Sequence, residues 1–311
     1  MFDSVSFKIE NFQKQDFAHL IENYVYKEPQ NFGNKFLVDW QNLRINFYPE
    51  TKIVNVKNSA HKFFNREIEK NDLGNSDDFT RPNLIRTISL LEEGFSREAK
   101  EMKLFGRLEY GINIPTGNLN PYDDIICRYQ SIVKNFTNPF YDFYNPKGKV
   151  FAKFCPFSHY TVKCYSKGHQ MGIPKMNVLR YEIANHTLEE TRRLFKKADV
   201  SVEDLKKKQI WILCLEKLLE IYELIRVIPT GQDGEELYSQ MLCYSNSLIR
   251  KDFKKNLAKY QNTLKEVHDS YKNSKNNVHS VVKESLDEQY LKLVNKTKIV
   301  VKKSESLTLN L

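Results

Sequence analysis

The 311-residue sequence lacks several patterns that would assign it to a class at once. Its five cysteines are odd in number and never form a Cys-x-x-Cys spacing, so neither a disulfide framework nor a zinc site is indicated. A secretory signal has a basic segment followed by a long apolar run, and the first twelve residues contain no such pattern. The most apolar stretch, residues 210–228, carries five charged side chains and predicts a soluble helix rather than a membrane span. These absences, with no internal repeat, predict a cytoplasmic protein with reduced cysteines and no membrane partner.

The composition predicts a folded protein with a polyanionic partner. Hydrophobic residues make up 41% of the chain and aromatic residues 13%, which is enough to build a packed core. Lysine and arginine total 48 against 39 acids, giving a net charge of +9. Such an excess favours nucleic acid through counterion release, although a solvated basic surface is the alternative.

Strand patterns dominate early in the chain and helix patterns dominate late. This order predicts an α+β fold whose central, mostly antiparallel sheet has helices on one face and is followed by a helical C-terminal region. The segments expected to be strands are residues 1–10, 35–49, 51–58, 104–114, 149–154, 161–167 and 176–183. The segments expected to be helices are residues 80–102, 123–136 and 203–226.

We expect two units, an α+β domain over residues 1–200 and a helical region over 201–311 with a basic, partly disordered tail. Apolar residues between 253 and 271 follow a heptad spacing for less than three heptads. This seam either packs on the body of the protein or forms a dimer zipper, and the sequence leaves the oligomeric state open. Residues 250–275 carry a formal excess of five positive charges, and Lys254 and Lys255 are candidate DNA contacts.

The segment YSKGHQMGIPKMNVLRYE, residues 165–182, reads as a strand, a turn and a strand. Alternation places Tyr165 and Lys167 on one face of the first strand, and Arg180 and Glu182 on one face of the second. A half-solvated antiparallel sheet explains this pattern without any function. Whether Tyr165 and Glu182 share a face depends on the register, which the sequence does not fix.

Four pieces in order resemble the rolling-circle replication initiators of filamentous phages and related plasmids, the gene II/X type. After an N-terminal block of strands come Ser-x-x-Lys-apolar at 59–63, Arg-Leu-Glu at 107–109, Tyr-Ser-Lys at 165–167 and Leu-Arg-Tyr-Glu at 179–182. The resemblance covers roughly residues 1 to 200. It implies an enzyme that binds a replication origin and nicks one DNA strand to start rolling-circle replication in the cytoplasm of a bacterial host.

The resemblance implies that Tyr165 is the nucleophile that becomes linked to a 5′ phosphate, with Lys167 beside it. A phenol with a pKa near 10 attacks poorly at neutral pH, and a nearby cation favours the phenolate. The resemblance places metal ligands at Glu109, Glu182 and Gln170, and hard Mg²⁺ or Mn²⁺ prefers such oxygen donors. Glu109 stands where the family more often has Asp, Gln170 where an acid is frequent, and no His-apolar-His pair occurs among the seven histidines.

Two further residues each have two possible roles. Arg180 either holds a phosphate or pairs with a carboxylate of the sheet, and Lys62 either contacts DNA or lies exposed. The partners implied are origin DNA, the single strand released by nicking, and host replication proteins. Two other functional classes stay open: a non-catalytic origin- or single-strand-binding protein whose sheet aromatics stack on bases, and a scaffold whose basic helices bind an acidic partner.

Overall fold

The structure is a computed structural model that describes residues 1–72, 74–133, 137–145, 148, 150–173, 175–227 and 278–295. A ten-stranded sheet forms its centre, in the order β2-β3-β4-β5-β1-β6-β12-β11-β10-β9, and every neighbouring pair is antiparallel. The α+β fold with a largely antiparallel sheet is therefore confirmed. The strands of this sheet are β1 (Phe2–Ile9), β2 (Gln30–Asn31), β3 (Phe36–Trp40), β4 (Leu43–Tyr48), β5 (Ile53–Ser59), β6 (Lys103–Pro115), β9 (Tyr141–Tyr144), β10 (Val150–Pro156), β11 (Tyr160–Ser166) and β12 (Val178–Asn185).

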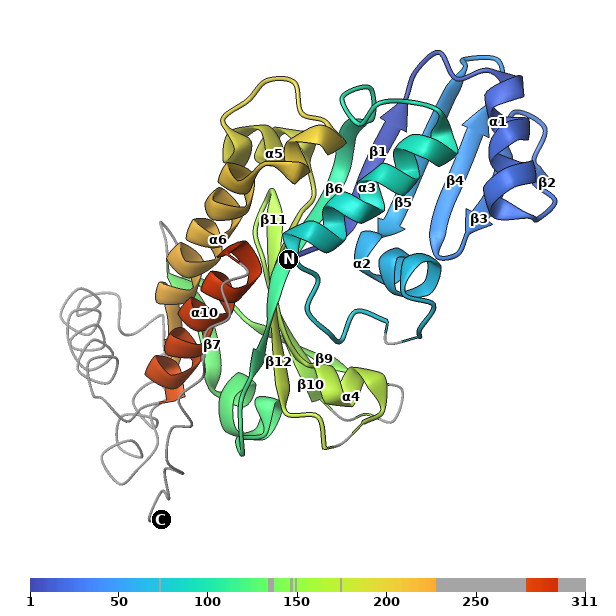
Figure 1. Ribbon diagram of the computed structural model, residues 1–311. Coiled ribbons are helices and arrows are strands. Elements are labelled where there is room, and N and C mark those ends of the chain that lie inside the picture. Colours follow the sequence, from blue (N-terminus) through green and yellow to red (C-terminus); the bar gives the residue numbers. More distant parts are fainter. Residues whose placement is uncertain are drawn as a thin grey trace, which may run out of the picture.

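A second, three-stranded sheet and a set of helices complete the fold (Figure 1). The small sheet has the order β13-β7-β8, with β7 (Tyr129–Val133), β8 (Thr137–Pro139) and β13 (Ile225–Val227). The helices are α1 (Lys14–Leu20), α2 (Ala60–Phe63), α3 (Arg81–Phe95), α4 (Lys167–Met171), α5 (Leu188–Phe195), α6 (Lys208–Glu223) and α10 (Val278–Asn295). Short helical turns are η1 (Ile21–Val25), η2 (Phe64–Ile68), η3 (Pro121–Ile125), η4 (Ile126–Arg128) and η5 (Val202–Lys206).

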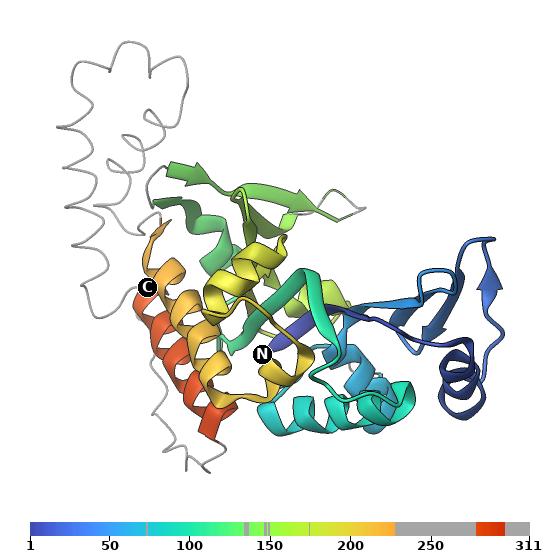
Figure 2. The same ribbon diagram turned by 90° about the horizontal axis from the view of Figure 1, so that it is seen from above.

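The central strands have one apolar face, and the long helices cover it. In β6, alternation places the apolar Leu108, Tyr110, Ile112 and Ile114 on the helix side, where they are buried. Glu109 and Asn113 on the other side are buried as well. The ring of Trp211 in α6 meets Phe2 of β1 edge to face, and the hydroxyl of Tyr181 in β12 donates to the carbonyl of Leu218. Figure 2 shows α3, α6 and α10 on the same side of the strands.

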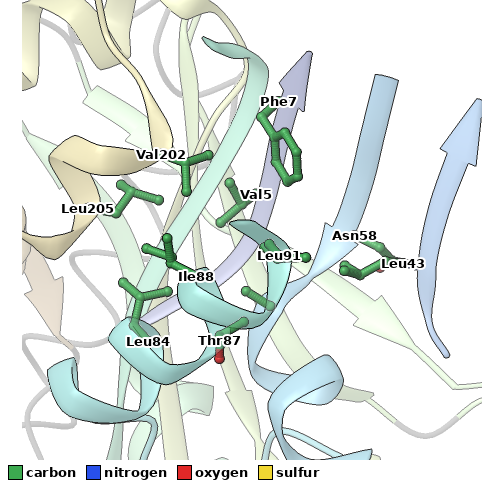
Figure 3. Close-up of a pocket in the computed structure, with 11 residues that line it drawn as sticks. Val5, Phe7, Leu43, Asn58, Leu84, Thr87, Ile88, Leu91, Val202 and Leu205 are labelled. Carbon is green, nitrogen blue, oxygen red and sulfur yellow. The ribbon is translucent and has the colours of Figure 1, made fainter. Parts of the chain in front are cut away.

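Helix α3 packs on the apolar face of β1, where it leaves one small cavity (Figure 3). The cavity has a volume of about 20 Å³, and its lining includes Val5, Phe7, Leu84, Ile88 and Leu91. A space of that size holds about one water molecule. It is a packing defect of the core and not a ligand site.

The structure corrects three local expectations. Residues 123–136 do not form one helix, because η3 and η4 are followed by strand β7. Tyr129 of β7 is buried, and its hydroxyl lies 3.2 Å from that of Tyr222 in α6, so tertiary packing overrides the local pattern. Lys167 is not a strand residue, because β11 ends at Ser166, whose side chain caps α4 by accepting from the backbone N–H of His169. Strand β13 also lies in the part of the chain that we expected to be helical.

Beyond residue 200, α6 and α10 lie against the sheet and against each other, and Val282, Leu286 and Leu293 of α10 are buried. The helical character of the C-terminal region is confirmed for these two helices, whereas the division into two units at residue 200 stays a prediction. The heptad segment at 253–271 lies outside the described residues. Of the helices that the structure describes, none combines the length and apolar character needed to cross a membrane.

Candidate functional site

The pairing of β6, β12 and β11 settles the register that the sequence left open. Lys163 lies directly opposite Glu182, and Tyr165 lies directly opposite Arg180. On the other side of β12, Arg180 is opposite Asn113. Directly opposed residues point to the same side of a sheet. We call this side, which carries Arg107, Glu109, Asn113, Lys163, Tyr165, Arg180 and Glu182 and faces away from the long helices, the polar face.

A row of ion pairs crosses the polar face. Arg107 and Lys163 both donate to Glu109 Oε1, and Lys163 Nζ lies 2.9 Å from Glu182 Oε1. Arg180 Nε then donates to Glu182 Oε2 over 3.1 Å. The Arg107 side chain is 50% exposed and that of Glu182 only 3%, so the row runs from solvent into the interior.

Gly111 makes the close approach of β6 and β12 possible. It lies opposite Glu182, and a Cβ built on it would be 2.3 Å from Glu182 Cβ and 2.5 Å from the carbonyl oxygen of Tyr181. Any larger residue would push the two strands apart. The glycine therefore sets where the Glu182 carboxylate sits.

The phenol of Tyr165 belongs to the buried end of this row. Its hydroxyl donates to Glu182 Oε2 over 3.3 Å, and only 6% of the residue is exposed. Burial, and then the negative charge of Glu182, raise the pKa of Tyr165 well above its ordinary value, although Arg180 opposes them. The phenol is accordingly protonated at rest, and its hydroxyl lies near the charged groups Glu182 and Arg180.

The pKa values of the charged neighbours show that the row is ionised. Burial alone would raise the pKa of Glu182, but Arg180 and Lys163 outweigh burial and hold that pKa below its ordinary value. Burial would lower the pKa of Lys163, but Glu182 and Glu109 outweigh it and raise the pKa. A buried carboxylate is tolerated because it is paired in this way.

Lys167, at the start of α4, is a second buried cation beside Tyr165. Its Nζ donates to Asn75 Oδ1 over 2.6 Å and to Gln170 Oε1 over 2.7 Å, and it lies 5.3 Å from the centroid of the Tyr165 ring. Burial, followed by the charge of Arg180, lowers the pKa of Lys167 to about 7. This lysine changes its charge near neutral pH.

Asp3 of β1 anchors the other side of the cluster. It accepts hydrogen bonds from Ser59 Oγ and, over 2.5 Å, from Asn75 Nδ2, and one of its oxygens is 4.0 Å from Arg180 Nη2. Burial would raise the pKa of Asp3, but Arg180 and then the Ser59 hydroxyl lower it below its ordinary value. Asp3 thus links the first strand to the Tyr165 cluster.

Residues 74–77 lie over this end of the polar face. Asn75 bridges Asp3 and Lys167, and Asn113 Nδ2 donates to the carbonyl oxygens of Ser76 and Asp77 over 3.1 and 2.8 Å. The segment thereby contacts Asn113, the partner of Arg180, and Lys167, the neighbour of the Tyr165 ring, and both Tyr165 and Arg180 are buried. We call residues 74–77 the covering segment.

The two glutamates expected to bind a metal come together, but a lysine lies between them. Glu109 and Glu182 both accept from Lys163 Nζ, which takes the position between the carboxylates that a dication would need. Gln170 bonds to Lys167 rather than to either carboxylate. Within the described ranges, no group of three or more His, Cys, Asp or Glu residues could hold a metal ion. In this arrangement the residues do not fit Mg²⁺ or Mn²⁺, and a metal role stays a prediction that requires Lys163 to move.

The structure places the expected DNA contacts in different settings. Arg180 is buried and pairs with Glu182, which agrees with the alternative that it pairs with a carboxylate of the sheet. Lys62 lies in α2 and is half-buried, and Lys254 and Lys255 lie outside the described residues. All these roles stay predictions.

Sequence reasoning missed three members of the cluster. Lys163 stands two residues before Tyr165, so strand alternation alone places it on the same face. Asp3 and Asn75 are separated by 72 residues and carry no local signal.

Aromatic side chains lie at the edge of the polar face. In the pairing of β9 with β10, Phe143 lies opposite Ala152 and Tyr141 opposite Phe154, and Ala152 is itself opposite Tyr165. Tyr141 and Phe143 are 57% and 47% exposed. The face that carries Tyr165 therefore also presents rings to solvent, which is a property of surfaces that bind single-stranded nucleic acid.

Comparison with known proteins gives similarity to solved structures. No family model matches the chain, and no curated protein matches it. Among solved structures, a rolling-circle replication initiator protein from Geobacillus stearothermophilus is similar over 75% of this chain and 87% of its own, with a TM-score of 0.42 and 14% sequence identity. A similarity of that size does not assign a family or a function to the chain.

Proposed function

We propose that this protein starts rolling-circle replication by cutting one strand of origin DNA, with Tyr165 as the nucleophile. The observation that carries the proposal is the hydrogen bond from the Tyr165 phenol to Glu182, within a set of cations on the face that the long helices leave uncovered. Acid and cations converge there with a potential nucleophile, which is the arrangement that phosphoryl transfer needs.

The proposed reaction is a transesterification. The phenolic oxygen of Tyr165 attacks a backbone phosphorus, and the bond from phosphorus to the 3′ oxygen breaks. The phenolic proton passes to Glu182, and the released 3′ oxygen takes a proton from water. The products are a tyrosine ester of the 5′ phosphate and a free 3′ hydroxyl that primes synthesis, and the reverse reaction rejoins the strand.

Two features of the resting site must change before this reaction. The covering segment has to move, because only 6% of Tyr165 is exposed. The phosphate must also draw Arg180 or Lys163 away from Glu182, since both cations keep that carboxylate a weak base. A bound phosphodiester supplies the negative charge that makes such an exchange favourable.

A second candidate is a non-catalytic protein that binds single-stranded DNA. The burial and raised pKa of Tyr165 favour it, as do the exposed rings at the edge of the same face. Both candidates predict DNA binding, so only strand cleavage separates them.

The test is incubation of a supercoiled plasmid that carries the cognate origin with wild-type protein and with Tyr165→Phe, in the presence and absence of Mg²⁺. We expect the wild type to relax the plasmid and to remain covalently linked to the 5′ end, and Tyr165→Phe to do neither. Tyr160→Phe is the matched control, because Tyr160 lies in the same strand but on the opposite, apolar face. If Tyr165→Phe relaxes the plasmid as well as Tyr160→Phe does, Tyr165 is not the nucleophile.

A further inference from the structure

A pocket of about 350 Å³ lies on the polar face, at the exposed end of the row of ion pairs. The residues that line it include Ser6 of β1, Arg44 of β4, Lys57 of β5 and three residues of β6, Phe105, Gly106 and Arg107. Lys57 lies opposite both Arg44 and Ser6 in the strand pairing, so these three side chains share one face. The volume reaches the lower end of the range of ligand pockets, about 300–1,000 Å³.

A bulge in β6 shapes this pocket. Val5 pairs with Leu108 and Phe7 with Leu104, so the single β1 residue between them faces three residues of β6. Gly106, at the middle of the bulge, has a φ of +64°, a left-handed conformation that glycine adopts without strain. Bulges next to functional sites redirect side chains, and this one brings Phe105 and Arg107 into the same lining.

The lining combines positive charge with an aromatic ring. Arg44, Lys57 and Arg107 contribute three cations, and none of the described residues that line the pocket is acidic. Arg44 and Arg107 each also pair with an acid outside the lining, Asp39 and Glu109. Lys57 Nζ lies 5.4 Å from the centroid of the Phe105 ring. A cation beside a half-exposed ring can hold a phosphate while the ring stacks on the adjoining base.

We infer that this pocket binds one nucleotide of a single DNA strand, with its base on Phe105 and its phosphate between Lys57 and Arg107. The inference rests on the proposed function for the identity of the ligand, DNA. Arg107 lies six residues before Asn113, which is across Arg180 from Tyr165, so the pocket is roughly 20 Å from the phenol along the strand direction. The bound nucleotide therefore flanks the cleavage position and is not cut itself.

The experiment is fluorescence anisotropy of a labelled 12-nucleotide oligo(dT), titrated with full-length protein at two or more salt concentrations. We expect Phe105→Leu to weaken binding about tenfold, from lost stacking, and Lys57→Gln to weaken it and to reduce the salt slope by about 0.7, from one lost phosphate contact. Phe32→Leu and Lys35→Gln are matched controls, since Lys35 lies over the exposed Phe32 ring at 5.7 Å outside the pocket. Both should stay within twofold of the wild type.

Thermal melting of each variant reports its folding, and Lys57→Gln changes an exposed side chain, so it carries the test if Phe105→Leu does not fold. The inference is overturned if the pocket variants bind the oligonucleotide with the same affinity and the same salt slope as the wild type. It is also overturned if a DNA duplex of the same length competes as well as the single strand does. If the pocket variants bind like the wild type and the protein still nicks DNA through Tyr165, the pocket inference fails and the proposed function stands. Loss of binding in the pocket variants without any nicking would leave the inference standing and remove the proposed nicking.

Discussion

Lys163 faces Glu182 directly across two adjacent strands, and its Nζ lies 2.9 Å from Glu182 Oε1. The same nitrogen donates to Glu109, so one lysine satisfies two carboxylates that are each less than a tenth exposed. This cation holds together three neighbouring strands of the polar face. It also stands where a metal-dependent reaction would place its ion.

Removing that cation should destabilise the protein. In Lys163→Met, Glu109 and Glu182 stay buried and lose a shared partner, and we expect the free energy of unfolding to fall by about 3 kcal/mol. Urea titration measures it, with a lower midpoint at an unchanged m-value. Lys8→Met is the control, because Lys8 pairs with Glu10 at the surface and should cost less than about 1 kcal/mol. Adding Glu109→Gln to Lys163→Met should recover part of the loss, and equal losses for Lys163→Met and Lys8→Met would show that the buried pairs contribute little.

The same substitution tests the expected metal. If Glu109 and Glu182 bind Mn²⁺ or Mg²⁺, the ion has to displace the Lys163 ammonium, so Lys163→Met should bind Mn²⁺ at least tenfold more tightly than the wild type. Isothermal titration calorimetry with Mn²⁺ measures both affinities. Adding Glu109→Gln to the variant should abolish the gain. Identical wild-type and Lys163→Met isotherms would remove these glutamates as metal ligands.

Much of the sheet could be predicted from the sequence because strand alternation is a local property. The alternation in 104–114 and 176–183 separates apolar from charged residues correctly, and it places Glu109, Arg180 and Glu182 with their charges on one side. The register is not local, because it depends on which residues pair across strands. Only the pairing of Lys163 with Glu182 and of Tyr165 with Arg180 shows that these groups meet.

The parts that could not be predicted depend on contacts between distant segments. Asn75 joins Asp3 to Lys167 across 72 and 92 residues, and no local sequence pattern predicts either contact. Lys167 looks like the next residue of an alternating strand, but Ser166 caps a helix there. Lys167 lies near Tyr165 as we expected. It does so from the first turn of a helix and not from the next position of the strand.

The buried Lys167 should make stability depend on pH near neutrality. Its pKa is lowered from 10.5 to about 7 in the folded protein, so between these values the unfolded chain binds one more proton than the folded one. The free energy of unfolding therefore rises as pH increases from about 7 toward 10.5. As pH decreases this contribution falls, and it is fully lost once pH has fallen through 7. Chemical denaturation measures the free energy of unfolding at each pH. Between pH 7 and pH 8.5 it should rise on the order of 1 kcal/mol more for the wild type than for Lys167→Met. Lys14→Met, at an exposed helix position, should keep the wild-type pH dependence, and parallel curves for the wild type and Lys167→Met would contradict a lowered pKa.

The covering segment should open more readily when its side-chain anchor is removed. Asn75 joins the segment to the ionised Asp3 and to Lys167 by two hydrogen bonds, and a bond to a charged group stabilises by about 1.5–3 kcal/mol. In Asn75→Ala we expect amide hydrogen exchange at residues 74–78 to accelerate at least tenfold, while Asn46→Ala, at a half-buried position of β4, leaves it unchanged. Because Asn75 holds Lys167, whose Nζ lies beside the Tyr165 ring, Asn75→Ala should also raise the nicking rate wherever opening limits the reaction. Unchanged exchange at residues 74–78 would mean that the carbonyl contacts with Asn113 hold the segment closed without Asn75, and Asn113→Ala would then be the variant that opens it.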